Sequence, residues 1–278
     1  MGSLYILGNG FDLYHNMKTS YFDFKDYLKR NNAYIYNFID KNMKCNDLWA
    51  DLENTLMKLP YKKIVSRKNK ADISFVVFQE GLKYCLYEWI FGIKYPANKK
   101  KLYELNEDAL FITFNYTMFL ENIYHISPKK ILHIHGMVDN PKSNNNLIFG
   151  YREEMFKKWF SEYMSGNVKY NVLDGYIDKA ALKYDNIKKM NASLFKDCNA
   201  IIKKHTLFFN KLQNVDKITI IGHSLSDNDL IYFNHIAEKV NKKADYNITY
   251  YGEENYRLIL KQAKKFVGYN NVKYTNLK

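Results

Sequence analysis

Short apolar runs, each ended by glycine or a polar turn, alternate along the chain with longer stretches whose apolar positions recur every three to four residues. The short runs are typical of buried strands, and the longer stretches are typical of helices that bury one face. We expect strands at residues 4–7, 109–114, 130–134, 147–149, 218–221, 246–251 and 272–275. We expect helices at residues 21–40, 48–58, 72–92, 231–240 and 253–267. Because strands separated by helices form parallel sheets, the pattern predicts an α/β fold with inserted helical segments.

The domain organisation follows from the same pattern. The 278 residues contain no internal repeat and no low-complexity linker, and a chain of this length forms one or two domains. Residues 152–212 are helical in pattern and contain no clear strand. We therefore expect a single α/β domain over residues 1–278, with helical insertions at about 21–105 and 152–212.

Composition excludes several classes of protein. An apolar content of 47% excludes a disordered chain. The apolar runs are far shorter than the ~20 residues that cross a bilayer, so we expect no membrane segment. The three cysteines form no CxxC pair, which excludes a four-thiolate zinc site and makes the reducing cytoplasm the expected compartment: Cys45, Cys85 and Cys198.

The net charge of +13 raises the question of a nucleic-acid partner, because a positive surface attracts phosphates. Planar guanidinium groups, which read guanine edges, are scarce in this chain. The arginines are Arg30, Arg67, Arg152 and Arg257. The lysines alternate with acidic residues along the predicted helices, a pattern typical of solvated helix faces. Nucleic acid therefore stays open as a partner without being favoured.

The first predicted strand runs directly into Gly8-Asn9-Gly10-Phe11-Asp12. Two glycines at this point let the backbone approach a phosphate, and the start of the following helix favours an anion. The third glycine of a full dinucleotide fingerprint is missing, so the segment also fits a tight strand-to-helix turn. Asp12 fits either a helix cap or a contact to a ligand hydroxyl. We take Gly8, Asn9, Gly10 and Asp12 as candidate cofactor-binding residues.

Two further predicted strands end in polar residues. Asn115 follows the strand 109–114, where an amide could bind a ribose or a water, or cap a helix. His133 and His135 follow the next strand, and alternation would put both on one face. They fit a buried structural pair, a metal pair that has no third ligand at convincing spacing, or a base at His135. The residues alone favour a helix cap at Asn115 and a catalytic or ribose-binding role at His135, and we expect no metal.

The strand 218–221 ends in Gly222-His223-Ser224, and residues 226–229 have the spacing of a helix capping box. Ser224 or Asp227 could hold ribose hydroxyls, and we take both, with Gly222, as cofactor-binding candidates. A serine-hydrolase elbow is excluded, because Ser226 stands where that motif needs glycine. Since parallel strands end at one edge of the sheet, all four motifs are expected to converge there.

The chain resembles the bacterial AbiH family of phage abortive-infection proteins. The residues that carry the resemblance are residues 4–13, His15, Thr19, Ser20, Tyr21, Asp23, Phe24, Trp49, residues 51–53, residues 114–117, Glu121, residues 133–136 and residues 222–229. The chain departs from the expected family pattern at Asn16 and Lys18, where Gly and Pro are expected.

The order of the motifs is also similar to the sirtuin-like fold, which is a Rossmann-like parallel sheet that binds NAD. This resemblance implies diphosphate binding by Gly8 and Gly10, catalysis by Asn115 and His135, and ribose binding by Gly222 and Ser224. The four-cysteine zinc module of the sirtuin deacylases is missing, so deacylation is not expected. The Asn-x-Asp usual in such sites reads Asn115-Tyr116-Thr117 here, so one carboxylate is missing.

Together the resemblances imply a cytoplasmic antiphage effector that binds NAD and hydrolyses its nicotinamide–ribose bond, leaving ADP-ribose. Asn115 would position the water or the ribose, and His135 would accept a proton. Carboxylates that could stabilise positive charge on the sugar are Asp12, Asp227 and Asp229.

Two alternatives remain at this stage. One is a catalytically inactive nucleotide-binding sensor or interaction module. It is supported by Thr117, which stands where sirtuin-like sites have an aspartate. The other is a nucleic-acid-binding or nuclease effector. It is supported by the net charge of +13 and the 17% aromatic content. A phage-derived trigger and assembly into an oligomer are left open.

Overall fold

The computed structural model describes residues 2–42, 49, 51–58, 71–95, 100–139, 147–165, 184–268 and 271–277. The chain divides into two compact units. Unit 1 comprises Met1–Thr19, Ile90–Leu147 and Cys198–Lys278, and unit 2 comprises Ser20–Trp89 and Ile148–Asp197. All strands of the sheet belong to unit 1, so the strand-end motifs do as well.

The sheet of unit 1 is parallel throughout its described strands, in the order β3-β2-β1-β4-β5-β6. The strands are β1 (Gly2–Leu7), β2 (Leu110–Thr113), β3 (Ile131–His133), β4 (Val215–Ile221), β5 (Asp245–Tyr250) and β6 (Val272–Asn276). Central strands of a parallel sheet are buried on both faces, which explains the continuous apolar runs. The order is that of the doubly wound Rossmann sheet. The predicted Rossmann-like α/β fold class is confirmed.

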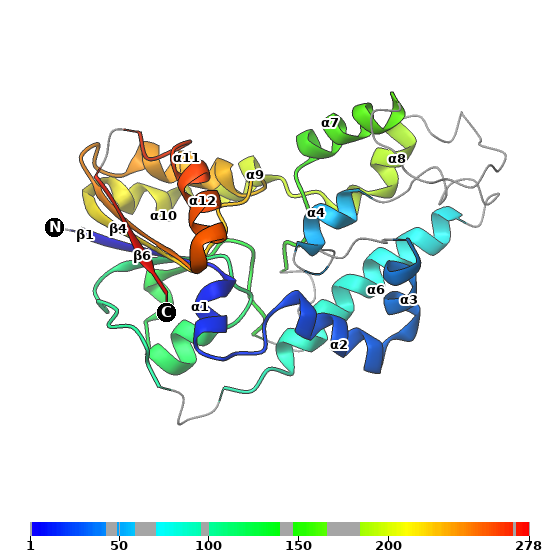
Figure 1. Ribbon diagram of the computed structural model, residues 1–278, viewed down its shortest axis with the longest axis horizontal. Helices are drawn as coiled ribbons and strands as arrows, with labels where there is room; N and C mark the ends of the chain where they lie inside the picture. The colour runs from blue at the N-terminus through cyan, green and yellow to red at the C-terminus, as the bar shows by residue number, and fades with distance from the viewer. Residues whose placement is uncertain are drawn as a thin grey trace. The chain divides into compact units, whose positions relative to one another are not determined.

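Short helices connect the strands of unit 1. They are α1 (Asn9–Tyr14), the π-helical turn η1 (Leu120–Tyr124), η2 (Pro128–Lys130), α9 (Cys198–Lys204), α10 (Thr206–Asn210), η5 (Lys211–Asn214), α11 (Leu230–Lys239) and α12 (Gly252–Ala263). Helices α9, α10 and α11 pack against one another, and α12 packs against β5 (Figure 1). Chain direction and sheet order together bring the ends of β1 and β4 side by side, because these two strands pair over their whole length.

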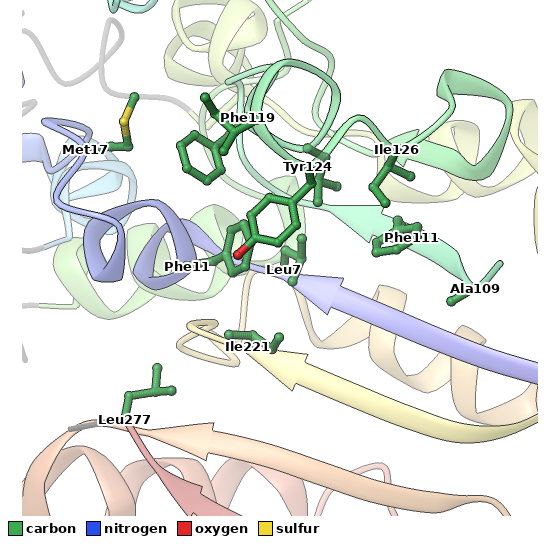
Figure 2. Packing of buried hydrophobic residues seen from close by; sticks show 12 residues of the cluster. Leu7, Phe11, Met17, Ala109, Phe111, Phe119, Tyr124, Ile126, Ile221 and Leu277 are labelled. Carbon is green, nitrogen blue, oxygen red and sulfur yellow. The ribbon is translucent and has the colours of Figure 1, made fainter. Parts of the chain in front are cut away.

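An aromatic cluster lies beside the end of β1. The rings of Phe11, Phe119 and Tyr124 lie together in Figure 2, with Phe11 5.8 Å from Phe119 and 5.5 Å from Tyr124 between ring centroids. His15 completes this cluster as a core residue: its Nδ1 bonds the Phe11 carbonyl at 2.7 Å, and its Nε2 bonds the Tyr124 hydroxyl at 2.7 Å. The packing fixes α1, and therefore the segment that follows the first strand, on the sheet.

Asn16 ends the turn after α1 with a left-handed backbone, at φ 55°. Glycine adopts this conformation without strain, and Asn tolerates it better than most other residues. Asn16 therefore retains the turn conformation that the expected Gly would adopt.

Unit 2 is helical in its described part. Its helices are α2 (Tyr21–Asn31), α3 (Ala33–Asn42), α4 (Leu52–Met57), α6 (Ala71–Phe91, whose last residues belong to unit 1), α7 (Glu153–Met164), α8 (Tyr184–Met190) and the 3-10 turn η4 (Ala192–Leu194). Ser20 and Asp23 form a capping box at the start of α2. A buried ion pair joins the two segments of the unit, with Lys196 Nζ 2.7 Å from Glu53 Oε2.

Three predicted elements differ in the structure. The helix expected at 21–40 is two helices, because Asn32 leaves the helical region and its side chain accepts a bond from the Ile35 amide at 3.1 Å. Residues 147–149 are not a strand; Leu147 and Phe149 are apolar because they are buried. The capping box expected at Ser226 is not formed, since α11 begins only at Leu230.

Parts of two predicted helical regions, residues 48, 50 and 166–183, lie outside the described residues, as does Cys45. None of the described helices has the length and apolar content that a membrane crossing requires.

Candidate functional site at the carboxyl edge of the sheet

The loops after β1 and β4 are in direct backbone contact. The Gly8 amide donates to the Ile221 carbonyl at 3.0 Å, and the Gly10 amide donates to the Gly222 carbonyl at 2.8 Å. A Cβ on Gly8 would lie 2.6 Å from the Cα of His223, and one on Gly10 would lie 2.7 Å from the Cα of Gly222. This approach of two backbones accounts for both glycines. Their role in diphosphate binding stays a prediction.

Gly222 is the residue that this contact constrains most. Its φ is +64°, and a Cβ there would lie 2.2 Å from the Phe11 amide nitrogen. We expect Gly222→Ala to lower the free energy of unfolding by about 1–2 kcal/mol through backbone strain, and by roughly 1–3 kcal/mol more through the clash. Urea unfolding of the purified chain measures the loss.

Gly252→Ala is the matched control, because Gly252 has a similar φ of +72° and open space where its Cβ would stand. This variant should lose only the strain contribution, about 1–2 kcal/mol. Equal losses in the two variants would show that the added Cβ at Gly222 is accommodated without a clash.

Asp12 is buried in α1 and holds the first polar cluster together. Its carboxylate accepts hydrogen bonds from Asn115 Nδ2 at 2.8 Å and from Thr117 Oγ1 at 2.6 Å. Burial raises the pKa of Asp12 from 3.8 to about 6, although these two hydrogen bonds and the charge of His133 act to lower it. Of the two roles open from the sequence, the helix cap is wrong, because Gly8 is the N-cap and has no side chain.

Asn115 lies just past the end of β2, where the sequence predicted it. It does not cap a helix, because the next helical turn, η1, has Phe119 at its N-cap. Its Nδ2 also donates to the Gly8 carbonyl at 3.2 Å. Its Oδ1 is buried and has no hydrogen-bond donor among the described residues. A buried acceptor in this state needs a water or a ligand to satisfy it.

His133 and His135 do not share a face as the alternation predicted, because β3 ends at His133 and a turn follows. His133 Nε2 lies 2.8 Å from Glu121 Oε1, and its Nδ1 lies 3.4 Å from the Asn115 carbonyl. His133 therefore connects Glu121 to the backbone of the first cluster at Asn115. The described residues contain no group of three or more His, Cys, Asp or Glu side chains that could hold a metal ion.

His135 belongs to a second cluster. Its Nε2 lies 3.5 Å from Asp229 Oδ1, and Asp229 Oδ2 lies 3.8 Å from His223 Nε2. The ring of Phe114 packs edge-on against both histidines, at 5.1 Å from His135 and 4.3 Å from His223. Because Asn115 follows Phe114 in the chain, the two clusters are neighbours along the end of β2.

The remaining candidates lie outside both clusters. Asn9 is exposed, and its side chain donates to the Thr19 carbonyl at 2.8 Å. Ser224 is exposed. Asp227 is paired with Lys265 Nζ at 2.7 Å, and its side chain is 55% exposed. These three residues therefore form no part of the buried polar network.

Thr117 and Glu121 were not among the candidate site residues, whereas Asp229 was named as a carboxylate that could stabilise the sugar cation. Thr117 lies two residues after Asn115, so its position after the strand could have singled it out. Its partner Asp12 is 105 residues away in the chain, which no local pattern reveals. Helix α1 thus places the Asp12 carboxylate beside Asn115 and Thr117.

Comparison with known proteins supports one assignment. The family profile described as "Bacteriophage abortive infection AbiH" matches residues 4–74 and 67–250, a span that holds both clusters. Among curated proteins, none matches the chain. Because the matched residues make up most of its length, the chain belongs to the AbiH family of bacteriophage abortive-infection proteins.

Proposed function

We propose that this AbiH protein, whose family assigns it to defence against phage, binds NAD and hydrolyses the bond between nicotinamide and ribose. The strand order supports a nucleotide ligand, since sheets of this order bind dinucleotides at the carboxyl edge where the order reverses. That point is the junction of β1 and β4, where the glycine loop lies.

The observation that carries the proposal is the cluster of Asp12, Asn115 and Thr117. The bond to be broken joins the ribose to a cationic pyridinium, and its cleavage passes through an oxocarbenium-like transition state. A carboxylate in a buried site stabilises such a cation strongly, because little water screens it. The Asn115 Oδ1, which has no donor among the described residues, would accept a hydrogen bond from the ribose or from the attacking water.

His135 would serve as the base. Nicotinamide leaves as a neutral molecule and needs no general acid, so the proton to be moved is that of the attacking water. An imidazole suits this transfer near neutral pH.

A second candidate function is nucleotide binding without turnover. The observation that favours it is burial: Asp12, Asn115 and His135 are 1%, 7% and 4% exposed. A sensor can hold its ligand in such a site without admitting water for hydrolysis.

Melting curves of the purified full chain test binding before turnover. Ligand at 100 times its Kd stabilises a protein by about 2.7 kcal/mol, so excess ADP-ribose or NAD should raise Tm by roughly 5–10 °C. Asn115→Ala should lose most of this rise. Asn241→Ala should keep it, because Asn241 lies at the other end of the sheet, where its amide donates to the Val215 carbonyl.

The outcomes separate the candidates. A rise with nicotinamide release supports the NAD hydrolase, and a rise without release, even in phage-infected cells, favours the sensor. No rise with either nucleotide contradicts both.

A further inference from the structure

Asp229 precedes α11, where an aspartate normally caps the helix, yet it makes no capping hydrogen bond to the first turn. Its carboxylate instead faces side chains from two strand-end motifs, with one hydrogen bond and two ion-pair contacts. Oδ2 accepts from Ser226 Oγ at 3.2 Å and lies 3.8 Å from His223 Nε2, while Oδ1 lies 3.5 Å from His135 Nε2. The side chain is only 12% exposed.

The loop before Asp229 fixes the protonation of His223. The Leu225 amide donates to His223 Nδ1 at 2.8 Å, so the neutral ring carries its proton on Nε2, the nitrogen that faces Asp229. Leu225 holds this geometry with a left-handed backbone, at φ 54°, although it is not a glycine. Such strain persists only where the surrounding structure enforces it. The loop therefore holds His223 with its Nε2 toward the Asp229 carboxylate.

His135 has its orientation set by rings. Phe114 and Tyr232 pack against it at 5.1 Å and 5.8 Å, both at steep interplanar angles. A carboxylate beside one ring nitrogen draws the imidazole proton to that nitrogen, so Asp229 favours the Nε2–H form of His135. The Nδ1 atom is then the basic one.

We propose that Asp229 is a positioning residue for His135, holding the imidazole proton on Nε2 so that Nδ1 is the atom that accepts a proton. This inference rests on the proposed NAD hydrolysis. There, the water oxygen bonds to the anomeric carbon and its proton passes to Nδ1. The electron pair of the broken C–N bond leaves with nicotinamide.

Two-bond proton–nitrogen correlation spectra of the ¹⁵N-histidine-labelled full chain test the inference without NAD. His135→Gln assigns the His135 signals. We expect wild-type His135 to be in the Nε2–H form, and we expect the population of this form to fall in Asp229→Asn and Asp229→Ala. Melting curves identify which of these variants is folded. Nicotinamide release should fall about 10²-fold in the folded variant, with KM unchanged.

Glu238→Gln is the matched control. It removes a carboxylate that faces a different histidine, His235 of α11, with Glu238 Oε2 4.0 Å from His235 Nδ1. It should leave the His135 signals and nicotinamide release as in the wild type. An unchanged His135 tautomer in both Asp229 variants would overturn the inference. A changed tautomer with no release by the wild-type chain would uphold the pairing and contradict the hydrolysis instead.

Discussion

Replacing Asp12 with asparagine should stabilise the folded chain relative to the wild type by an amount that grows with pH, up to about 3 kcal/mol. Burial raises the pKa of Asp12 from 3.8 to about 6, so the folded protein holds a proton that the unfolded chain releases between these values. The stability of the wild type therefore falls as the pH rises from about 4 to about 6. The asparagine side chain carries no charge, so the variant escapes this loss.

Urea unfolding at pH 4.5, 6 and 7.5 measures the difference. Asparagine can keep both contacts, since its Oδ1 can accept from Asn115 and its Nδ2 can donate to the Thr117 hydroxyl, which also accepts. Asp108→Asn is the control: the Asp108 side chain is 94% exposed, so removing its charge relieves no cost of burial and should give no comparable gain in stability. If the gain in the free energy of unfolding of Asp12→Asn does not grow with pH, burying the Asp12 charge has no cost.

The same variant should release no nicotinamide, because the carboxylate that would stabilise the sugar cation is gone. A gain in stability together with a loss of activity is what a strained functional site predicts. Loss of both would indicate that Asp12 is only a structural residue.

The fold was predictable because its causes are local. The run 218–221 contains three isoleucines and no charged side chain, so it is found inside β4, and the long helical pattern at 72–92 is found as α6. The strand predicted at residues 147–149 is wrong, because Leu147 and Phe149 are buried outside any strand and give the same apolar pattern as a strand.

The site was predictable only in part, because its contacts join distant segments. Parallel topology led us to expect Asn115 and His135 at the same edge as the glycine loop, and both lie there. The partners of these residues could not be predicted: Asp12 is 103 residues from Asn115, and the turn after β3 directs His135 to Asp229 instead of to the face of His133. The spacing of apolar and polar residues does not indicate where so short a turn begins.

Replacing His135 with glutamine should lower kcat for nicotinamide release by about 10²–10⁴-fold, the range that a general base contributes. Glutamine is close to histidine in size, so it fills the space between Phe114 and Tyr232 that an alanine would leave empty. It cannot take up a proton. Because the interaction arises only in the transition state, KM should change little.

His205→Gln is the control for the loss of a histidine, since His205 lies at the start of α10, outside both clusters. Its kcat should equal that of the wild type, and melting curves should show both variants folded. In cells that the wild-type chain protects from phage, His135→Gln should lose protection and His205→Gln should keep it. Full protection by His135→Gln, with nicotinamide release intact, would remove His135 from the mechanism and leave Asp12 and Asn115 to act on the sugar without a base.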